Sequence, residues 1–160
     1  MKSDTLGVKM KNRRGITLLE LVVVMAIVAI GAAFVAPNIG AWIPNYRLKS
    51  AARDIVSTLR TAQLKAVSTN TVYGVAFDSG SIQLYRSSGG LIPEGGSVNL
   101  PTGIQFNNNT FPINGTLEKP FAQFNANSTS SAGSITLRNP RGMVKRIAVA
   151  PTTGRIKIAD

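Results

Sequence analysis

The feature that most constrains this chain is a long apolar segment near its N-terminus, preceded by basic residues. Residues 16–36 make up 21 positions, of which twelve are Leu, Ile, Val or Phe, and Glu20 is their one ionisable residue. As a helix, this segment spans about 31 Å, close to the hydrocarbon thickness of a bilayer. Each large apolar residue favours insertion by about 0.3 to 0.6 kcal/mol, whereas one charged residue costs about 3 kcal/mol. We therefore expect one membrane crossing over residues 16–37, in spite of Glu20.

The charge ahead of the apolar segment predicts its orientation. Five basic residues and one acidic residue precede Gly15, which gives residues 1–14 a charge of +4. Basic residues beside a spanning helix stay on the cytoplasmic side of the membrane. The rest of the chain is then expected to lie on the outer side.

Three interpretations of the N-terminal region compete, and two of them meet physical objections. A secretory signal with a cleavage site near Ala33 or Ala36 has an apolar core of about 7 to 15 residues, and this segment is longer. A plain membrane anchor accounts for the length but leaves Glu20 unexplained. An ionisable residue inside a membrane is costly, and it usually has a partner.

The third interpretation rests on the order Gly15-Ile16-Thr17-Leu18-Leu19-Glu20 between basic residues and an apolar helix. This order resembles the class III leader of type IV pilins and pseudopilins. In that family a prepilin peptidase cuts after the glycine, here Gly15, and methylates the new N-terminus, here Ile16. The family more often has Phe at that position. The resemblance implies a cleaved leader over residues 1–15 and a transmembrane and filament-core helix over residues 16–37.

The same resemblance gives Glu20 a partner. Cleavage frees an amine, whose unperturbed pKa is about 8, and this amine can supply the positive charge that a carboxylate in a membrane needs. The amine would belong to Ile16 of a neighbouring subunit. Glu20 is therefore the candidate assembly residue.

The composition argues against an enzyme. The chain contains neither Cys nor His, so the commonest general base, a common metal ligand and the most reactive nucleophile are missing. Asp78, Glu94 and Glu118 lie in separate segments, without the spacing of paired catalytic carboxylates or of a calcium site. We expect no enzymatic activity, no cofactor and no metal site. Without Cys there is also no disulfide, in contrast to many major pilins.

Residues 38–160 are expected to form a single exported domain that begins with a helix. Pro37, Gly40 and Pro44 predict a break or kink where the chain leaves the membrane. An amphipathic helix over about 45–68 is then indicated by apolar residues at helical spacing, which should cover a sheet: Leu48, Ala52, Ile55, Leu59, Ala62 and Ala66.

A β-sheet is expected over about residues 71–158. Alternating apolar residues predict a hairpin of residues 71–77 and 81–86 and a short strand at 121–124. A flexible glycine-rich loop is expected at 87–96. The last third predicts a three-stranded meander, with strands at 134–138, 143–149 and 155–158. The expected fold is α+β and pilin-like: a long N-terminal helix packed on an antiparallel sheet.

The C-terminal half extends the resemblance to one branch of the pilin-like proteins. Phe124-Asn125, Gly133-Ser134-Ile135-Thr136-Leu137 and Gly154-Arg155-Ile156 resemble the GspH/FimT branch, which comprises minor pseudopilins of type II secretion and minor type IV pilins. The resemblance implies a filament subunit with a single-pass anchor in the bacterial inner membrane and a C-terminal domain in the periplasm. Its implied partners are other pilin or pseudopilin subunits, prepilin peptidase and the inner membrane.

Two functions remain open within this branch: a structural subunit of the type II secretion pseudopilus, and a minor pilin that binds DNA during DNA uptake. The chain has a formal charge of +11, and a basic patch is the electrostatic requirement for binding phosphates. DNA-binding members of the branch carry a Gly-Arg-x-Arg motif, and this chain has Gly154-Arg155-Ile156-Lys157. The candidate DNA-binding residues are Arg138, Arg141, Lys145, Arg146, Arg155 and Lys157. Because strand residues alternate, Arg155 and Lys157 share one face whereas Lys145 and Arg146 point to opposite faces, so only part of the set is expected to converge.

Overall fold

The computed structural model describes residues 16–159, without the side chains of residues 35–39 and 41. The chain divides into two compact units between Ile39 and Gly40, and each unit is described by itself. The first unit contains the N-terminal part of one long helix, α1 (Leu18–Ser68). The second unit contains the rest of α1 and all ten strands.

Both ends of α1 carry recognisable caps. At its start, the hydroxyl of Thr17 accepts a hydrogen bond from the backbone N–H of Glu20 at 3.2 Å, which makes Thr17 the N-cap. At its end, Asn70 adopts a left-handed conformation with φ 51°. The N–H of Thr71 reaches the carbonyl of Ala66 at 3.2 Å, which is the Schellman bond that closes a helix.

Of the break or kink expected near Pro37, Gly40 and Pro44, the break does not occur, because α1 continues through all three residues. Each proline removes one backbone donor and clashes with one carbonyl, at a cost of about 3 kcal/mol. The helix assignment nevertheless runs without a gap from Leu18 to Ser68, so neither proline ends the helix. The expected transmembrane helix and the expected amphipathic helix thus belong to one element.

The membrane crossing expected from the sequence concerns the N-terminal part of α1. Within the described part of the chain, no helix is both long enough and apolar enough to cross a membrane. The crossing expected over residues 16–37 runs into residues whose side chains lie outside the description, and it stays a prediction.

The first sheet follows α1 in the chain, and its strands pair antiparallel. Its order is β3-β2-β1-β7-β6, and β4 also pairs with β2. The predicted hairpin is confirmed, since Tyr73 pairs with Arg86 and Phe77 with Ile82. The strands are β1 (Tyr73–Phe77), β2 (Ser81–Ser87), β3 (Leu91–Pro93), β4 (Val98–Asn99), β6 (Ile113–Asn114) and β7 (Lys119–Phe124).

The second sheet has the order β10-β9-β8-β5 and is also antiparallel. The predicted C-terminal meander is confirmed as β8, β9 and β10, and β5 adds a fourth strand beside β8. The register between β5 and β8 shifts between Phe106 and Asn108. The strands are β5 (Gln105–Asn109), β8 (Gly133–Arg138), β9 (Val144–Val149) and β10 (Ile156–Ala159).

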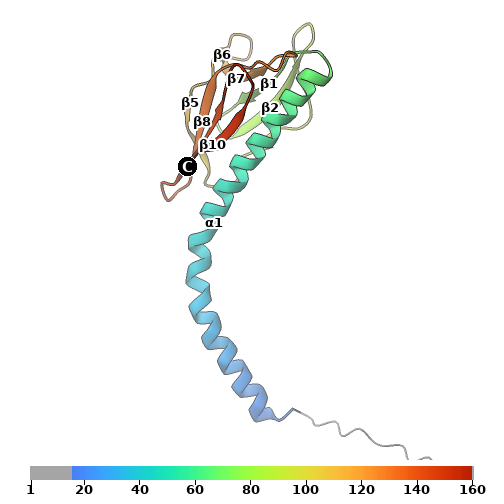
Figure 1. The fold of residues 1–160 in the computed structure, drawn as a ribbon. Coiled ribbons are helices and arrows are strands. Elements are labelled where there is room, and N and C mark those ends of the chain that lie inside the picture. The colour runs from blue at the N-terminus through green and yellow to red at the C-terminus, as the bar shows by residue number, and fades with distance from the viewer. Residues whose placement is uncertain (1–15, 160) are drawn as a thin grey trace, which may run out of the picture. The chain divides into compact units, whose positions relative to one another are not determined.

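The core of the second unit lies between α1 and the two sheets, with the helix running along the strands (Figure 1). The predicted apolar stripe is confirmed: each of its six residues is at most 1% exposed, from Leu48 to Ala66. Phe77 of β1 stacks on Phe111 at 5.3 Å between ring centroids and meets Phe106 of β5 edge-on at 6.0 Å. These rings join the two sheets, so the α+β fold expected from the sequence is confirmed.

The loop expected to be flexible at residues 87–96 contains regular structure instead. Strand β3 lies within it and pairs with β2, and the N–H of Glu94 donates to the carbonyl of Leu84 at 2.8 Å. The side-chain amide of Gln83 donates to the carbonyls of Glu94 and Gly95. The glycines made this segment resemble a loop, but a neighbouring strand and one amide side chain hold its backbone in place.

Candidate functional site

Three residues assigned from sequence are Gly15, Ile16 and Glu20, and the first two precede α1 in the chain. Gly15, the expected cleavage position, lies outside the described residues. Ile16 is exposed and directly precedes the N-cap Thr17. Glu20 is exposed in the first turn of α1, where a carboxylate interacts favourably with the positive end of the helix dipole. Thr17 and Glu20 have the spacing of a capping box, which sequence reasoning alone had not assigned.

The outer face of the second sheet gathers four of the six candidate DNA-binding residues. Residues that pair directly across strands share a face, and Arg138 pairs with Val144, Thr136 with Arg146 and Lys157 with Ala148. Because alternate residues of β9 point the same way, these three pairs lie on one face. We call Arg138, Arg146, Arg155 and Lys157 the basic face; all four are exposed.

Arg155 and Lys157 lie together at one end of the basic face. They border a shallow hollow of about 360 Å³, which Ala148 and Ala150 also line. Two neighbouring cations at such a hollow can attract an anionic group such as a phosphate.

The other two candidates lie elsewhere. Lys145 is half-buried and pairs with the buried Leu137, so it is on the opposite face of the sheet. Arg141 is in the turn between β8 and β9, and its guanidinium donates to the carbonyl of Gly40 at 3.4 Å. Alternation along the strand predicts that Lys145 and Arg146 point to opposite faces, and the register confirms this. The place of Arg141 beside α1 is not indicated by the sequence.

A buried asparagine that sequence reasoning missed joins this turn to α1. Asn139 is 3% exposed, and its side-chain amide donates to the side-chain oxygen of Asn45 at 2.9 Å. The side-chain oxygen of Asn139 accepts from the N–H groups of Arg141 and Met143 at 3.0 and 2.9 Å. The sequence around Asn139 signalled a turn, but nothing in it indicated the partner on the helix.

Two ion pairs are present among the described residues. Lys65, in the last turn of α1, is paired with Glu94, and Lys119 of β7 is paired with Asp78 in the β1–β2 turn. The hydrogen bond from Lys65 lowers the pKa of Glu94, and the same bond raises the pKa of Lys65. Likewise, the hydrogen bond from Lys119 lowers the pKa of Asp78. Both pairs connect segments far apart in the chain.

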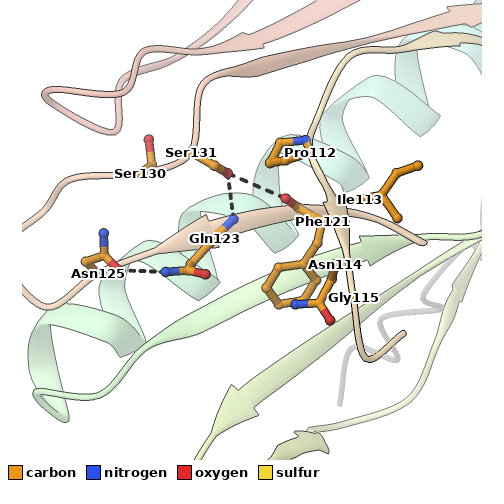
Figure 2. Close-up of a pocket in the computed structure, with 9 residues that line it drawn as sticks. All are labelled: Pro112, Ile113, Asn114, Gly115, Phe121, Gln123, Asn125, Ser130 and Ser131. Atoms are coloured by element: carbon orange, nitrogen blue, oxygen red, sulfur yellow. Dashed lines mark hydrogen bonds between the residues drawn. The ribbon is translucent and has the colours of Figure 1, made fainter. Parts of the chain in front are cut away.

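A groove of about 390 Å³ lies beside β7, between β6 and the segment that precedes β8 (Figure 2). The hydroxyl of Ser131 accepts from the N–H of Gln123 at 2.9 Å, and the Gln123 amide donates to the side-chain oxygen of Asn125 at 3.0 Å (Figure 2). The Phe121 ring lies over Gly74, where a Cβ atom would come within 2.2 Å of it. The nine residues that line this groove carry no ionisable side chain. They offer hydrogen bonds and apolar contact, and no acid or base.

Comparison with known families finds two matches, one near the N-terminus and one over most of the remaining chain. The prokaryotic N-terminal methylation motif matches residues 10–36, and the family model of the type II transport protein GspH matches residues 51–153. The chain belongs to the GspH family. A comparison with curated proteins finds no match.

Two kinds of solved structure share the fold. The minor pseudopilin EpsH from the type 2 secretion system of Vibrio cholerae is 12% identical with a TM-score of 0.59, covering 71% of this chain and 96% of that one. The type IV minor pilin FimU of Pseudomonas aeruginosa is 17% identical with a TM-score of 0.54, covering 71% of this chain and 93% of that one. The expected pilin-like identity and GspH/FimT branch are thus confirmed.

Membership of the GspH family indicates the general role of the chain. The family and the fold are those of structural pilin and pseudopilin subunits, which assemble with other subunits of the same kind. The methylation motif implies processing by a prepilin peptidase and a membrane-anchored filament subunit. The system in which this GspH-family chain acts is a separate question.

Proposed function

We propose that this GspH-family chain is a minor pseudopilin of a type II secretion system, assembled into a filament from the bacterial inner membrane. Residues 1–15 are a leader cut after Gly15, Ile16 is the methylated N-terminus, and residues 16–37 anchor the subunit with its C-terminal domain in the periplasm. The match to the type II transport protein GspH and the likeness to EpsH support the secretion assignment.

One observation carries the filament role: the exposure pattern of α1. The large apolar side chains described from Leu18 to Phe34 are between 48% and 80% exposed, whereas the stripe from Leu48 to Ala66 is buried against the sheets. A helix so apolar on all sides requires lipid or other helices around it. The small residues Ala26, Ala29 and Ala32 allow close helix packing, and Glu20 supplies one charge that fixes register with a neighbour's amine.

Replacing Glu20 tests this role. In a strain that lacks the chromosomal copy, we expect wild-type protein to restore exoprotein release into the medium and Glu20→Gln to fail, because the amide cannot pair with an amine as an ion. The matched control is Asp54→Asn, which removes an exposed carboxylate from the second half of α1. Normal secretion with Glu20→Gln would show that the carboxylate has no assembly role. Unaffected secretion in the deletion strain would exclude the secretion assignment.

The basic face supports a second candidate function, a minor pilin that binds DNA during uptake. Four cations on one face of a sheet can contact successive phosphates, and the likeness to the minor pilin FimU is compatible with a pilus subunit. Lys157 stands where the motif has Arg, so the site keeps the charge and loses a bidentate donor.

A salt-titrated gel shift on the compact unit Gly40–Asp160 tests DNA binding. The double variant Arg146→Gln and Lys157→Gln should flatten the dependence of log affinity on log salt by about 2, because each lost phosphate contact removes about 1. The control is Lys49→Gln with Arg86→Gln, which removes the same charge from residues outside the basic face. Equal losses in both variants, or no binding at low salt, would remove this function.

A further inference from the structure

The second unit has exposed apolar and aromatic side chains at the end where α1 joins it. Trp42 and Tyr46 lie one turn apart on α1, are 66% and 57% exposed, and have ring centroids 5.5 Å apart. In the turn between β8 and β9, Met143 is 50% exposed and Arg141 is also exposed. We call Trp42, Tyr46, Arg141 and Met143 the turn-end surface.

Two hydrogen bonds fix the two parts of this surface to each other. Asn139 at the start of the turn donates to Asn45 at 2.9 Å, and Arg141 donates to the Gly40 carbonyl at 3.4 Å. The backbone N–H of Met143 is held in turn by the side chain of Asn139. The β8–β9 turn therefore lies beside residues 40–46 of α1, where Figure 1 shows it next to the helix.

The chemistry of the turn-end surface matches a lipid headgroup layer. Trp and Tyr rings combine an apolar body with a polar group and concentrate at the boundary between membrane and water. Arg141 adds a cation, and no acidic residue occurs between Glu118 and Asp160 in the sequence. Basic residues close to a membrane are attracted to anionic lipids by about 1 kcal/mol each.

The position of Trp42 in the chain also agrees with a place in the headgroup layer. If residues 16–37 span the membrane as proposed above, Trp42 lies five helical residues, about 8 Å, beyond the hydrocarbon boundary. The headgroup layer on each side of a bilayer is about 5 to 8 Å thick. Trp42 then lies at the outer limit of this layer, and the hydrogen bonds that Asn139 and Arg141 donate hold the β8–β9 turn beside residues 40–46 of α1.

We propose that the turn-end surface docks onto the anionic headgroup layer of the membrane, which makes the β8–β9 turn a second membrane contact of the subunit. This inference rests on the proposed membrane anchor. The contact holds the second unit against the membrane before assembly, and it is broken when the subunit leaves the membrane for the filament.

The composition of the chain suits a direct test, because it has no Cys and one Trp. The full chain is reconstituted in vesicles of phosphatidylcholine with phosphatidylglycerol, carrying a spin label at a single introduced cysteine. Met143→Cys reports the turn, and Val24→Cys reports the proposed anchor. The control is Ser88→Cys, an exposed position next to Ser87, whose N–H bonds to Val72 beyond the far end of α1. That end is about 40 Å along the helix from Gly40.

We expect the Met143 label to be less accessible to a water-soluble paramagnetic reagent than the Ser88 label. We also expect lipids brominated near the headgroup to quench Trp42 fluorescence, with less quenching in Arg141→Gln. A Met143 label as accessible as the Ser88 label would overturn the docking, whatever the Val24 label reports. A Val24 label in water would instead overturn the proposed anchor.

Two further outcomes decide the nature of the partner. Equal protection of the Met143 label in purely phosphatidylcholine vesicles would overturn the assignment to anionic lipid. Protection that arises only after other subunits are added would identify a protein surface as the occupant, and it would overturn the membrane contact.

Discussion

At the scale of single residues, Gly154 shows how a sequence motif can have a structural cause. Gly154 precedes Arg155 in the sequence pattern that suggested a DNA-binding motif. In the structure it adopts φ 60°, and a Cβ atom there would lie 2.5 Å from Nε2 of Gln63 and 2.9 Å from the Ser128 carbonyl. The β9–β10 turn thus requires glycine in order to approach α1. The fold alone explains why position 154 is glycine. The case for DNA binding therefore rests on Arg155 and Lys157.

Gly154→Ala is therefore expected to destabilise the second unit by about 1 to 3 kcal/mol, from the left-handed backbone and the close contacts together. Chemical denaturation of the compact unit Gly40–Asp160 measures this change. Gly80→Ala is the control, because a Cβ atom at Gly80 would meet nothing within 4 Å. If both variants unfold at the same denaturant concentration, the packing account of Gly154 is wrong.

At the scale of elements, local patterns predicted which segments form but not every contact between them. The stripe from Leu48 to Ala66 and the β1–β2 hairpin follow from periodicity, because burial of one face imposes a repeat on the sequence. Strand β3 did not follow, since it is three residues long and its partner β2 supplies its stability. The bond between Asn139 and Asn45 likewise joins residues that are 94 positions apart, and no local signal records it.

Also at the scale of elements, two ion pairs connect distant segments of the chain. Lys65 of α1 pairs with Glu94, just after β3, and Lys119 of β7 pairs with Asp78. Glu94 and Asp78 have lowered pKa values in the folded chain because of hydrogen bonds from Lys65 and Lys119. A carboxylate with a lowered folded pKa stabilises the fold above its unfolded pKa, about 4, and this contribution is lost as the pH falls through the folded pKa. Thermal stability of Gly40–Asp160 should therefore decline as the pH falls below about 5.

Melting curves between neutral and acidic pH measure this decline for the wild type and for Glu94→Gln. The variant should have a smaller dependence on pH in acid, because one of the two carboxylates no longer titrates. Asp54→Asn, at an exposed position outside both ion pairs, should keep the wild-type slope. An unchanged slope in Glu94→Gln would mean that the pair with Lys65 contributes nothing to stability.

At the scale of the whole molecule, one chain combines an N-terminal methylation motif with a pilin-like domain. The fold class and the family could be predicted from sequence, because the order from Gly15 to Glu20 and the C-terminal strands are both distinctive. Strand alternation also predicted that Lys145 and Arg146 point to opposite faces. The place of Arg141 beside the helix could not be predicted, since it depends on a hydrogen bond to Gly40, 101 positions away. Of the break or kink expected near Pro37, the break does not occur, because α1 continues through this residue although proline disfavours a helix interior.

The central claim, that this chain is processed and assembled as a pilin-like subunit, is tested most directly by the intact mass of the mature protein purified from the membrane of cells that contain prepilin peptidase. We predict a chain that begins at Ile16 and carries one added methyl group, and an uncleaved chain when the peptidase gene is deleted. A chain that begins after Ala33 or Ala36 would instead show a secretory signal. A chain that still begins at Met1 in cells with the peptidase would show a plain anchor, and either result would contradict the account.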